Sequence, residues 1–358
     1  MVLIKVLTFN VDSDGKIKHN LTEMQNAFNN FIKEKLSDDS ILFISFQEDK
    51  STPVLLTEDF KNFLMIEGYK VIVNSKGISH FHIHSIIITK LNYDTLTVET
   101  KRLNWKNTKN YIVNHITFNN YNISFISTHF PIDTSDKDKL NLGYSIRAKI
   151  LDDILIKFVK NNNIVVLAGD LNFRINMDGI EQLTQFINQK KSEYNISEIF
   201  DINKFGPTCK IDPEPQIKGS EICQNHFNNR QFEPTQLKCN KNKQTDIETC
   251  ECGTLQCSHA INCYDKKYKR IPSYCDRVLT IQKQQNKIYD VTIVNSEIAG
   301  TIDKFSDHNA VYVEFQININ DNDNDDNDND NDNDNDTYVQ KYLKYKQKYL
   351  KLKHINLL

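Results

Sequence analysis

Short apolar runs rich in β-branched residues recur along this chain of 358 residues, separated by polar segments of varying length. Runs of this length and composition predict strands that are buried on at least one face. The nine predicted strands are Val2–Leu7, Ile41–Phe46, Ser85–Thr89, Tyr111–Phe118, Asn122–Thr128, Ile164–Ala168, Asp276–Ile281, Tyr289–Val294 and Ala310–Phe315.

Two other segments show the three-to-four-residue spacing of an amphipathic helix. The apolar stripes are Met24, Phe28, Phe31 and Ile32 in the first, and Ile146, Ile150, Ile154, Leu155 and Phe158 in the second. Strands outnumber helices, and many are separated only by short turns. We therefore expect an α/β protein with mixed or antiparallel layers rather than a doubly wound parallel sheet.

The net charge of −3 conceals a strong asymmetry near the C-terminal end. Residues 321–336 are Asp and Asn alone, with nine Asp, and residues 337–358 hold six Lys and no acid. Outside these segments the chain has equal numbers of basic and acidic residues. Because dedicated nucleic-acid binders usually carry a basic excess, we expect no nucleic-acid partner.

These shifts in composition predict the domain organisation. Residues 1–316 are expected to form one catalytic domain, with a Cys-rich insertion at 209–265. The Asp/Asn run cannot bury apolar surface, so residues 317–336 are expected to form a disordered linker. Residues 337–358 place lysines and leucines on different helical faces, which predicts a basic amphipathic helix. Such a helix can lie on an anionic membrane surface, and a self-associating or solvated helix is the alternative.

No apolar run approaches the ~18 residues of a spanning helix, and no signal-peptide cleavage site follows the first strand. We therefore expect a cytoplasmic protein, with peripheral membrane contact through the C-terminal helix. Besides Cys209 at its first position, the insertion holds six cysteines: Cys223, Cys239, Cys250, Cys252, Cys257 and Cys263. They could bind one Zn²⁺, although they lack the usual Cys-x2-Cys pair, and free thiols or disulfides are the alternative.

Polar residues suited to metal and phosphate chemistry stand at the ends of the predicted strands. They are Asn10, Glu48, His129, Asp170, Asn172, Asp307 and His308. In a sheet with antiparallel neighbours, the ends of some strands and the start of another share one rim. Carboxylates, amides and imidazoles gathered there would suit a hard cation and an anionic substrate.

The same residues carry a resemblance to a known superfamily. The blocks Leu7–Val11, Phe46–Glu48, Ser127–Phe130, Gly169–Arg174 and Ser306–His308 resemble, in order, those of the endonuclease/exonuclease/phosphatase superfamily. Two further blocks, Gly206–Lys210 and Arg270–Leu279, resemble signatures of its inositol polyphosphate 5-phosphatases. The resemblance implies a DNase I-like fold, a four-layer α-β-β-α sandwich with two packed mixed β-sheets.

The resemblance also implies an activity and a set of roles. The activity is Mg²⁺-dependent (or Mn²⁺-dependent) hydrolysis of a phosphate monoester, the 5-phosphate, of an inositol polyphosphate or phosphoinositide. Asn10 and Glu48 would hold the metal, and Asp170 would orient and deprotonate the attacking water. Asn172 and His129 would donate hydrogen bonds to the phosphate, and His308, oriented by Asp307, would bind it. Supporting roles fall to Asp276, Arg277 and Arg174, although Asp276 and Arg277 could instead form a structural ion pair.

Recognition of the other ring phosphates matches the family less closely. The expected substrate-binding residues are Lys109, Lys210, Lys269 and Arg270. Cys209 stands where the family has Tyr, and Tyr268 where it has Lys. Two other functions remain open: a metal-dependent endonuclease or phosphodiesterase of the same superfamily, and an inactive phosphoinositide-binding scaffold.

Overall fold

The computed structural model describes residues 1–11, 21–50, 52–77, 82–102, 110–118, 121–131, 140–160, 163–173, 182–199, 275–285, 289–299, 302, 306 and 308–319. The expected Cys-rich insertion, residues 320–336 of the expected linker and the expected basic C-terminal helix lie outside these residues. Within them, none of the helices combines the length and apolar character needed to cross a membrane.

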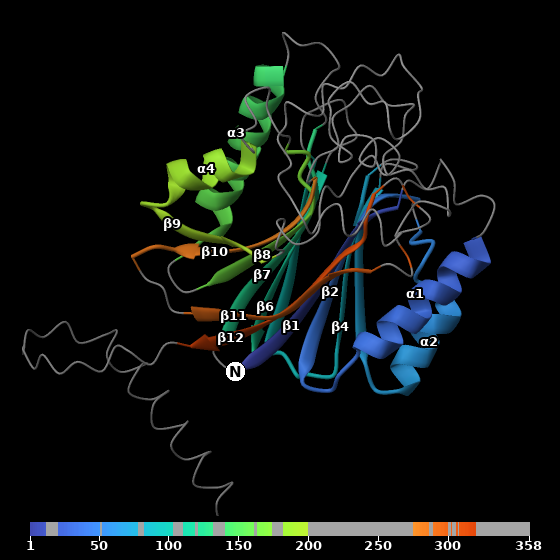
Figure 1. The fold of residues 1–358 in the computed structure, drawn as a ribbon. Coiled ribbons are helices and arrows are strands. Elements are labelled where there is room, and N and C mark those ends of the chain that lie inside the picture. Colours follow the sequence, from blue (N-terminus) through green and yellow to red (C-terminus); the bar gives the residue numbers. More distant parts are fainter. Residues whose placement is uncertain are drawn as a thin grey trace, which may run out of the picture. The chain divides into compact units, whose positions relative to one another are not determined.

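The described residues form two six-stranded sheets (Figure 1). The first sheet has the order β11 (Tyr289–Ile298), β12 (Val311–Ile319), β1 (Val2–Asn10), β2 (Ser40–Asp49), β4 (His82–Thr89), β3 (Lys70–Lys76). The second sheet has the order β5 (Thr95–Arg102), β6 (Asn110–Phe118), β7 (Tyr121–His129), β8 (Ile164–Asp170), β10 (Asp276–Lys283), β9 (Tyr194–Glu198). All nine predicted strands lie in or overlap these strands.

Each sheet contains one parallel pair at its centre and is otherwise antiparallel. Helix α1 (Leu21–Lys35) crosses over between β1 and β2, and helix α3 (Leu140–Phe158) between β7 and β8. Parallel neighbours need such a crossover because a short hairpin cannot connect them. Both predicted amphipathic stripes lie in these two helices. Each crossover brings the C-terminal ends of two strands to one rim.

Helices cover the outer face of each sheet, as Figure 1 shows. Helix α1 and α2 (Glu58–Ile66) pack on the first sheet through Phe28 and Phe60. Helix α3 and α4 (Gln182–Lys190) pack on the second sheet through Leu155 and Phe186. The expected four-layer α-β-β-α sandwich of two mixed sheets is therefore confirmed.

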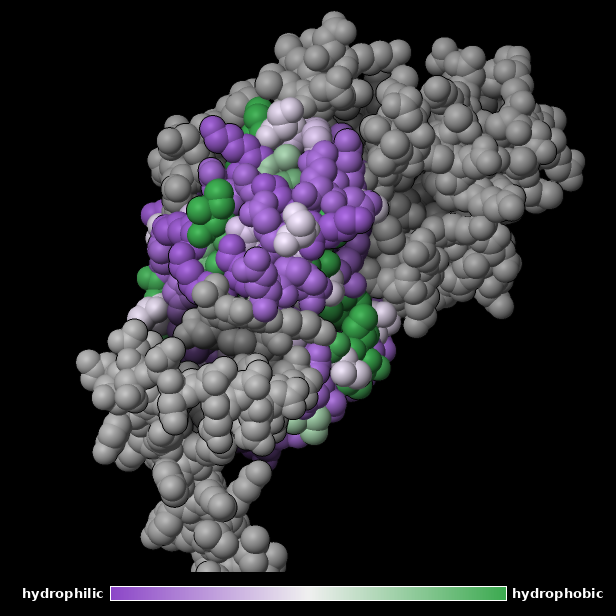
Figure 2. All heavy atoms as spheres, turned by 90° about the vertical axis from the view of Figure 1, so that its left-hand side faces the viewer, coloured by the Kyte–Doolittle hydropathy of each residue, from purple (hydrophilic) through white to green (hydrophobic). Residues whose placement is uncertain are grey.

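A third apolar core lies between the two sheets. Phe43 of β2 and Phe125 of β7 meet across it with ring centroids 5.1 Å apart. The outer face that carries α3 and α4 is instead mainly hydrophilic (Figure 2). The layer between the sheets is therefore buried. The termini of the strands form a rim at each of its two ends.

Strand β12 closes the first sheet against the chain's own beginning. It pairs antiparallel with β1, with Ile317 opposite Val2, and Ile317 is fully buried. The strand continues to Ile319, three residues beyond the expected domain boundary at residue 316.

Candidate active site

Strand alternation directs the predicted site residues into the layer between the sheets. Val6, Phe125, Ala168 and Val278 belong to the inter-sheet core. Residues an even number of positions away on the same strands share that face. Asn10, His129, Asp170 and Asp276 meet this condition, and each is at most 1% exposed. They gather at one end of the inter-sheet layer.

Glu48 reaches this cluster through a local break in alternation. Phe46 faces the helices on the outer side of the sheet, so regular alternation would send Glu48 there as well. The pairing of β2 with β4 shifts register between Phe46 and Asp49, and Glu48 has φ 54°. This β-bulge re-aims the carboxylate, and Glu48 Oε1 lies 3.5 Å from His129 Nε2.

Asp170 is the centre of the polar contacts. Its Oδ2 accepts a hydrogen bond from Asn10 Nδ2 at 3.1 Å and lies 3.4 Å from His129 Nε2. Its Oδ1 accepts the backbone N–H of Asn172 at 3.0 Å. His129 Nε2 thus lies near carboxylate oxygens from both sheets, those of Glu48 and Asp170. The cluster joins the ends of β1, β2, β7 and β8.

Asn172 adopts a left-handed backbone conformation, with φ 51°. Its Nδ2 donates to Phe130 O at 3.0 Å, which links the segments that follow β8 and β7. Glu48 and Asn172 are the two residues other than glycine with positive φ in the described part of the chain. Such strained positions often mark functional sites, and both lie in this cluster.

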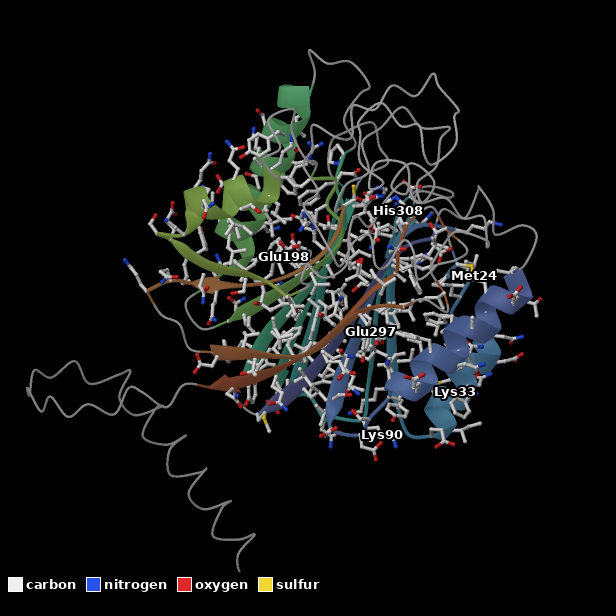
Figure 3. All side chains as sticks on the ribbon, viewed as in Figure 1. Met24, Lys33, Lys90, Glu198, Glu297 and His308 are labelled. Carbon is white, nitrogen blue, oxygen red and sulfur yellow. The ribbon has the colours of Figure 1, made fainter. Side chains whose placement is uncertain are left out.

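His308 joins the cluster through Asp276 and Ser306. Its Nδ1 lies 2.8 Å from Asp276 Oδ2, and Ser306 Oγ donates to Asn10 O at 2.7 Å. Figure 3 shows His308 at one end of the strands and Lys90 at the opposite end. The expected orienting residue, Asp307, lies outside the described residues, and the contact observed at His308 Nδ1 is with Asp276.

Asp276 stands directly opposite Asp170 in the β10–β8 ladder. Like charges in such a pair are unfavourable unless other groups compensate them. Here each acid has an imidazole beside it: His308 at Asp276 and His129 at Asp170. Two acid–imidazole pairs therefore lie side by side.

A second layer of polar groups lies beneath the cluster. Ser45 Oγ is 2.6 Å from Ser127 Oγ and donates to Ala168 O at 3.0 Å, so it connects the two sheets. Gln47 Nε2 donates to Ser45 Oγ at 2.7 Å. Each of these residues lies one to three positions before an expected site residue, so the network fixes the strand ends relative to each other.

Asp49 anchors the segment that follows Glu48. Its carboxyl group accepts the backbone N–H groups of Lys50 and Val54. Burial raises the pKa of Asp49 to about 7 and lowers the pKa of neighbouring His84 to about 4. Burial therefore favours the uncharged form of each side chain, and the Asp49 carboxyl group holds the segment through its two backbone hydrogen bonds.

Two buried arginines lie near the site strands without belonging to the cluster. Arg277 faces away from the inter-sheet layer and pairs with Glu198. Asp276 and Arg277 thus point to opposite faces of β10, which argues against the ion pair between them. Arg147 of α3 donates to Pro131 O at 3.3 Å and to Gln182 Oε1 at 2.8 Å. Arg147 thereby supports the segment after β7. The sequence did not predict this role, because Arg147 stands among the apolar residues of a helix.

Several expected site residues lie outside the described residues. They are Lys109, Arg174, Lys210, Lys269, Arg270 and Asp307. The structure therefore brings together the expected metal and catalytic residues Asn10, Glu48, His129, Asp170, Asn172 and His308, with Asp276 beside them. It gives no position for the expected ring-phosphate contacts.

The donor set fits a Mg²⁺ ion better than a transition metal. Glu48 supplies a carboxylate that is 22% exposed, the most accessible in the cluster, and Asn10 supplies an amide. Mg²⁺ typically takes one or two protein oxygens and completes its shell with water and phosphate. These two oxygen donors therefore suit a hard cation with few protein ligands. Among the described residues, no group of three or more His, Cys, Asp or Glu is arranged to hold a metal.

Comparison with solved structures shows how widely this fold is shared. The inositol polyphosphate 5-phosphatase domain of SPsynaptojanin, in complex with inositol (1,4)-bisphosphate and calcium ion, has a TM-score of 0.54 and 15% identity, covering 99% of this chain and 93% of that one. TDP2 of D. rerio, complexed with single strand DNA product, has a TM-score of 0.50 and 15% identity, covering 88% and 99%. At such identities the likeness concerns the fold alone.

A third similar structure shows that this fold serves unrelated chemistry. The Cimex nitrophorin ferrous NO complex has a TM-score of 0.52 and 13% identity, covering 89% of this chain and 99% of that one. Function must therefore be argued from the site rather than from the fold.

Comparison with curated proteins gave no match. A family model, in contrast, matches residues 7–314, which run from within β1 into β12. The matched stretch contains every residue of the cluster, from Asn10 to His308. The chain therefore belongs to the endonuclease/exonuclease/phosphatase family 2.

Proposed function

We propose that this protein is a divalent-metal-dependent phosphatase that removes the 5-phosphate from an inositol polyphosphate or a phosphoinositide. One observation carries the proposal: Asn10, Glu48, His129, Asp170 and Asn172 form one contact network between the sheets. The block at Arg270–Leu279, which resembles the 5-phosphatase signature, supports the choice of substrate.

Glu48 and Asn10 would hold the cation at the accessible side of the cluster. A bound divalent cation supplies Lewis-acid polarisation of a phosphoryl oxygen and neutralises charge on the leaving oxygen. Asn10 Nδ2 donates to Asp170 Oδ2, so its amide oxygen is the atom suited to a cation. The same amide therefore couples the cation site to Asp170.

Asp170 would orient and deprotonate the attacking water. The hydrogen bonds from Asn10 and from the Asn172 backbone hold its carboxylate in one orientation. A fixed general base of this kind contributes about 10²- to 10⁴-fold to a rate. No covalent phosphoenzyme is required by this arrangement.

His129, Asn172 and His308 would bind the phosphate oxygens. Asp276 accepts from His308 Nδ1, which leaves Nε2 as the ring atom directed at the substrate. Positioning and charge neutralisation of this kind are the main means of catalysing phosphoryl transfer. The proposed roles of Lys109, Lys210, Lys269 and Arg270 in ring-phosphate binding rest on the sequence blocks alone.

The test is phosphate release from a panel of inositol phosphates and phosphoinositides, run beside nicking of plasmid DNA and cleavage of single-stranded DNA. The proposal predicts release from 5-phosphorylated inositol compounds and no DNA cleavage. Cleavage of DNA without phosphate release would favour the phosphodiesterase function. Binding of phosphoinositides without turnover of any substrate would favour an inactive scaffold.

Metal removal should abolish activity. We expect no phosphate release in EDTA and recovery on addition of Mg²⁺ or Mn²⁺, because the donors at the site are oxygens suited to hard cations. Glu48→Gln should lower kcat by about 100-fold or more, since the cation contributes several kcal/mol to the transition state.

Glu297→Gln is the matched control. Glu297 lies on β11, forms an ion pair with Lys35 of α1, and lies away from His308 (Figure 3). Its activity and its stabilisation by Mg²⁺ in thermal unfolding should equal those of the wild type. Full turnover in EDTA would contradict the proposed mechanism.

A further inference from the structure

Asn110 carries a buried amide whose hydrogen-bonding capacity is unused. The residue is fully buried at the start of β6, and neither its Nδ2 nor its Oδ1 has a hydrogen-bond partner. Among the buried amide side chains of the described residues, it is the one for which both atoms lack a partner. Buried polar groups are normally paired, so this amide destabilises the unliganded protein.

The position of Asn110 places this amide beside the candidate active site. Tyr111 pairs with Thr128 in the β6–β7 ladder, so Asn110 stands opposite His129. Asn114, four residues further along β6, bonds to Ser85 and Asn74 of the other sheet. The even-numbered residues of β6 therefore face the inter-sheet layer, as His129 does. Directly opposite residues on one face have Cβ atoms about 5 Å apart.

The burial of Asn110 does not separate it from the substrate. His129, Asp170 and Asn172 are as deeply buried, at 0%, 1% and 1% exposure. A ligand that reaches His129 reaches the adjacent position on the same face as well. An amide in this place offers one donor group and one acceptor oxygen.

We infer that Asn110 is a further substrate-contacting residue, whose Nδ2 donates to an oxygen of the phosphate bound at His129. Its Oδ1 accepts from a water molecule that accompanies the phosphate. A hydrated phosphate supplies both partners that the amide lacks in the unliganded protein. The inference rests on the proposed phosphatase site, since it assumes that His129 contacts phosphate.

Asn114 provides a matched comparison on the same strand and face. Its amide is fully buried like that of Asn110, but its Nδ2 donates to Ser85 Oγ and its Oδ1 accepts from Asn74. A purely structural amide should behave as Asn114 does. A substrate-contacting amide should instead lower stability in the free protein and contribute only when the ligand is present.

The test compares Asn110→Leu with Asn114→Leu in the full chain with Mg²⁺, using inorganic phosphate as the probe. Thermal unfolding at increasing phosphate concentrations gives Tm and an apparent Kd. We expect Asn110→Leu to raise Tm without phosphate by about 2 °C or more. We expect it to weaken phosphate binding about tenfold, the loss of one hydrogen bond to a charged group. Asn114→Leu should lower Tm and leave phosphate affinity unchanged.

Three outcomes would overturn the inference: no stabilisation of the wild type by phosphate, equal phosphate affinity in Asn110→Leu and wild type, or a loss of Tm in Asn110→Leu like that in Asn114→Leu. Failure of the proposed function is a separate result. If no inositol compound is hydrolysed but Asn110→Leu still gains stability and loses phosphate affinity, the phosphate contact stands and only the substrate assignment fails.

Discussion

Replacement of Asp170 by Ala or Asn should lower phosphate release by at least about 100-fold, the usual contribution of a general base. The two variants separate chemistry from structure. Asn keeps an oxygen that can accept from the Asn172 backbone N–H, whereas Ala removes both acceptors of the carboxylate. Loss of activity in both, with near-wild-type unfolding of Asp170→Asn, would identify the charge as the essential property.

Asp152→Asn is the control for this comparison. Asp152 lies on α3, which covers the outer face of the second sheet, and it forms a partly exposed ion pair with Lys190 of α4. Such pairs contribute little to stability, so activity should be unchanged. Retention of more than about a tenth of wild-type activity in Asp170→Ala would remove the general-base assignment, because even weak general-base catalysis exceeds that factor.

Gly169→Ala should prevent folding. A Cβ on Gly169 would lie 1.9 Å from Thr128 O, a backbone atom of the neighbouring strand that cannot move aside without breaking the β7–β8 ladder. The residue also has φ +154°, which residues with a side chain rarely adopt. We expect a loss on the order of 5 kcal/mol or more, which is comparable with the whole stability of a typical domain.

The measurement is the yield of purified protein and the presence of a cooperative unfolding transition. Gly68→Ala is the matched control, because Gly68 also has positive φ (+86°) but a Cβ added there would meet no atom within 4 Å. This variant should fold and lose only about 1–2 kcal/mol through backbone strain. Equal yields and transitions for the two variants would contradict the steric argument.

The strands in the interior of each sheet could be predicted from the sequence, and most of those at the edges could not. β3, β5 and β9 are edge strands that the apolar runs did not indicate. Among the described strands each of them has a neighbour on one side only, so its side chains are less fully covered, and Lys70–Lys76 carries polar residues in half-buried positions. The edge strand β11 was predicted because it retains an apolar run.

The short helices escaped prediction for a related reason. α2 and α4 each have nine residues, and each buries only two large apolar side chains: Phe60 and Leu64, or Leu183 and Phe186. Two apolar residues three or four positions apart also occur in loops and strands, so two turns give no distinctive stripe. α1 and α3, at 15 and 19 residues, repeat the spacing often enough to be recognised.

The site residues were predictable as strand ends, whereas their partners were not. A sequence shows that Asn10 and Asp170 each end an apolar run, but not that the fold brings them to 3.1 Å across 160 positions of chain. The pairing of His308 with Asp276 depends on register in two sheets. The orientation of the Glu48 side chain depends on a β-bulge, and no residue type in β2 predicts that bulge.

The central place of β1 in the first sheet also governs when the site can form during synthesis. β1 pairs with β2 on one side and with β12 on the other, and Ser306 bonds to Asn10 O across 296 positions of sequence. At about 5–20 residues per second, the ribosome needs roughly 15–60 s between these segments. Throughout that time the nascent chain exposes one unpaired edge of an apolar strand. Chaperone capture of this edge, rather than early catalysis, is the fate to be expected of an incomplete chain.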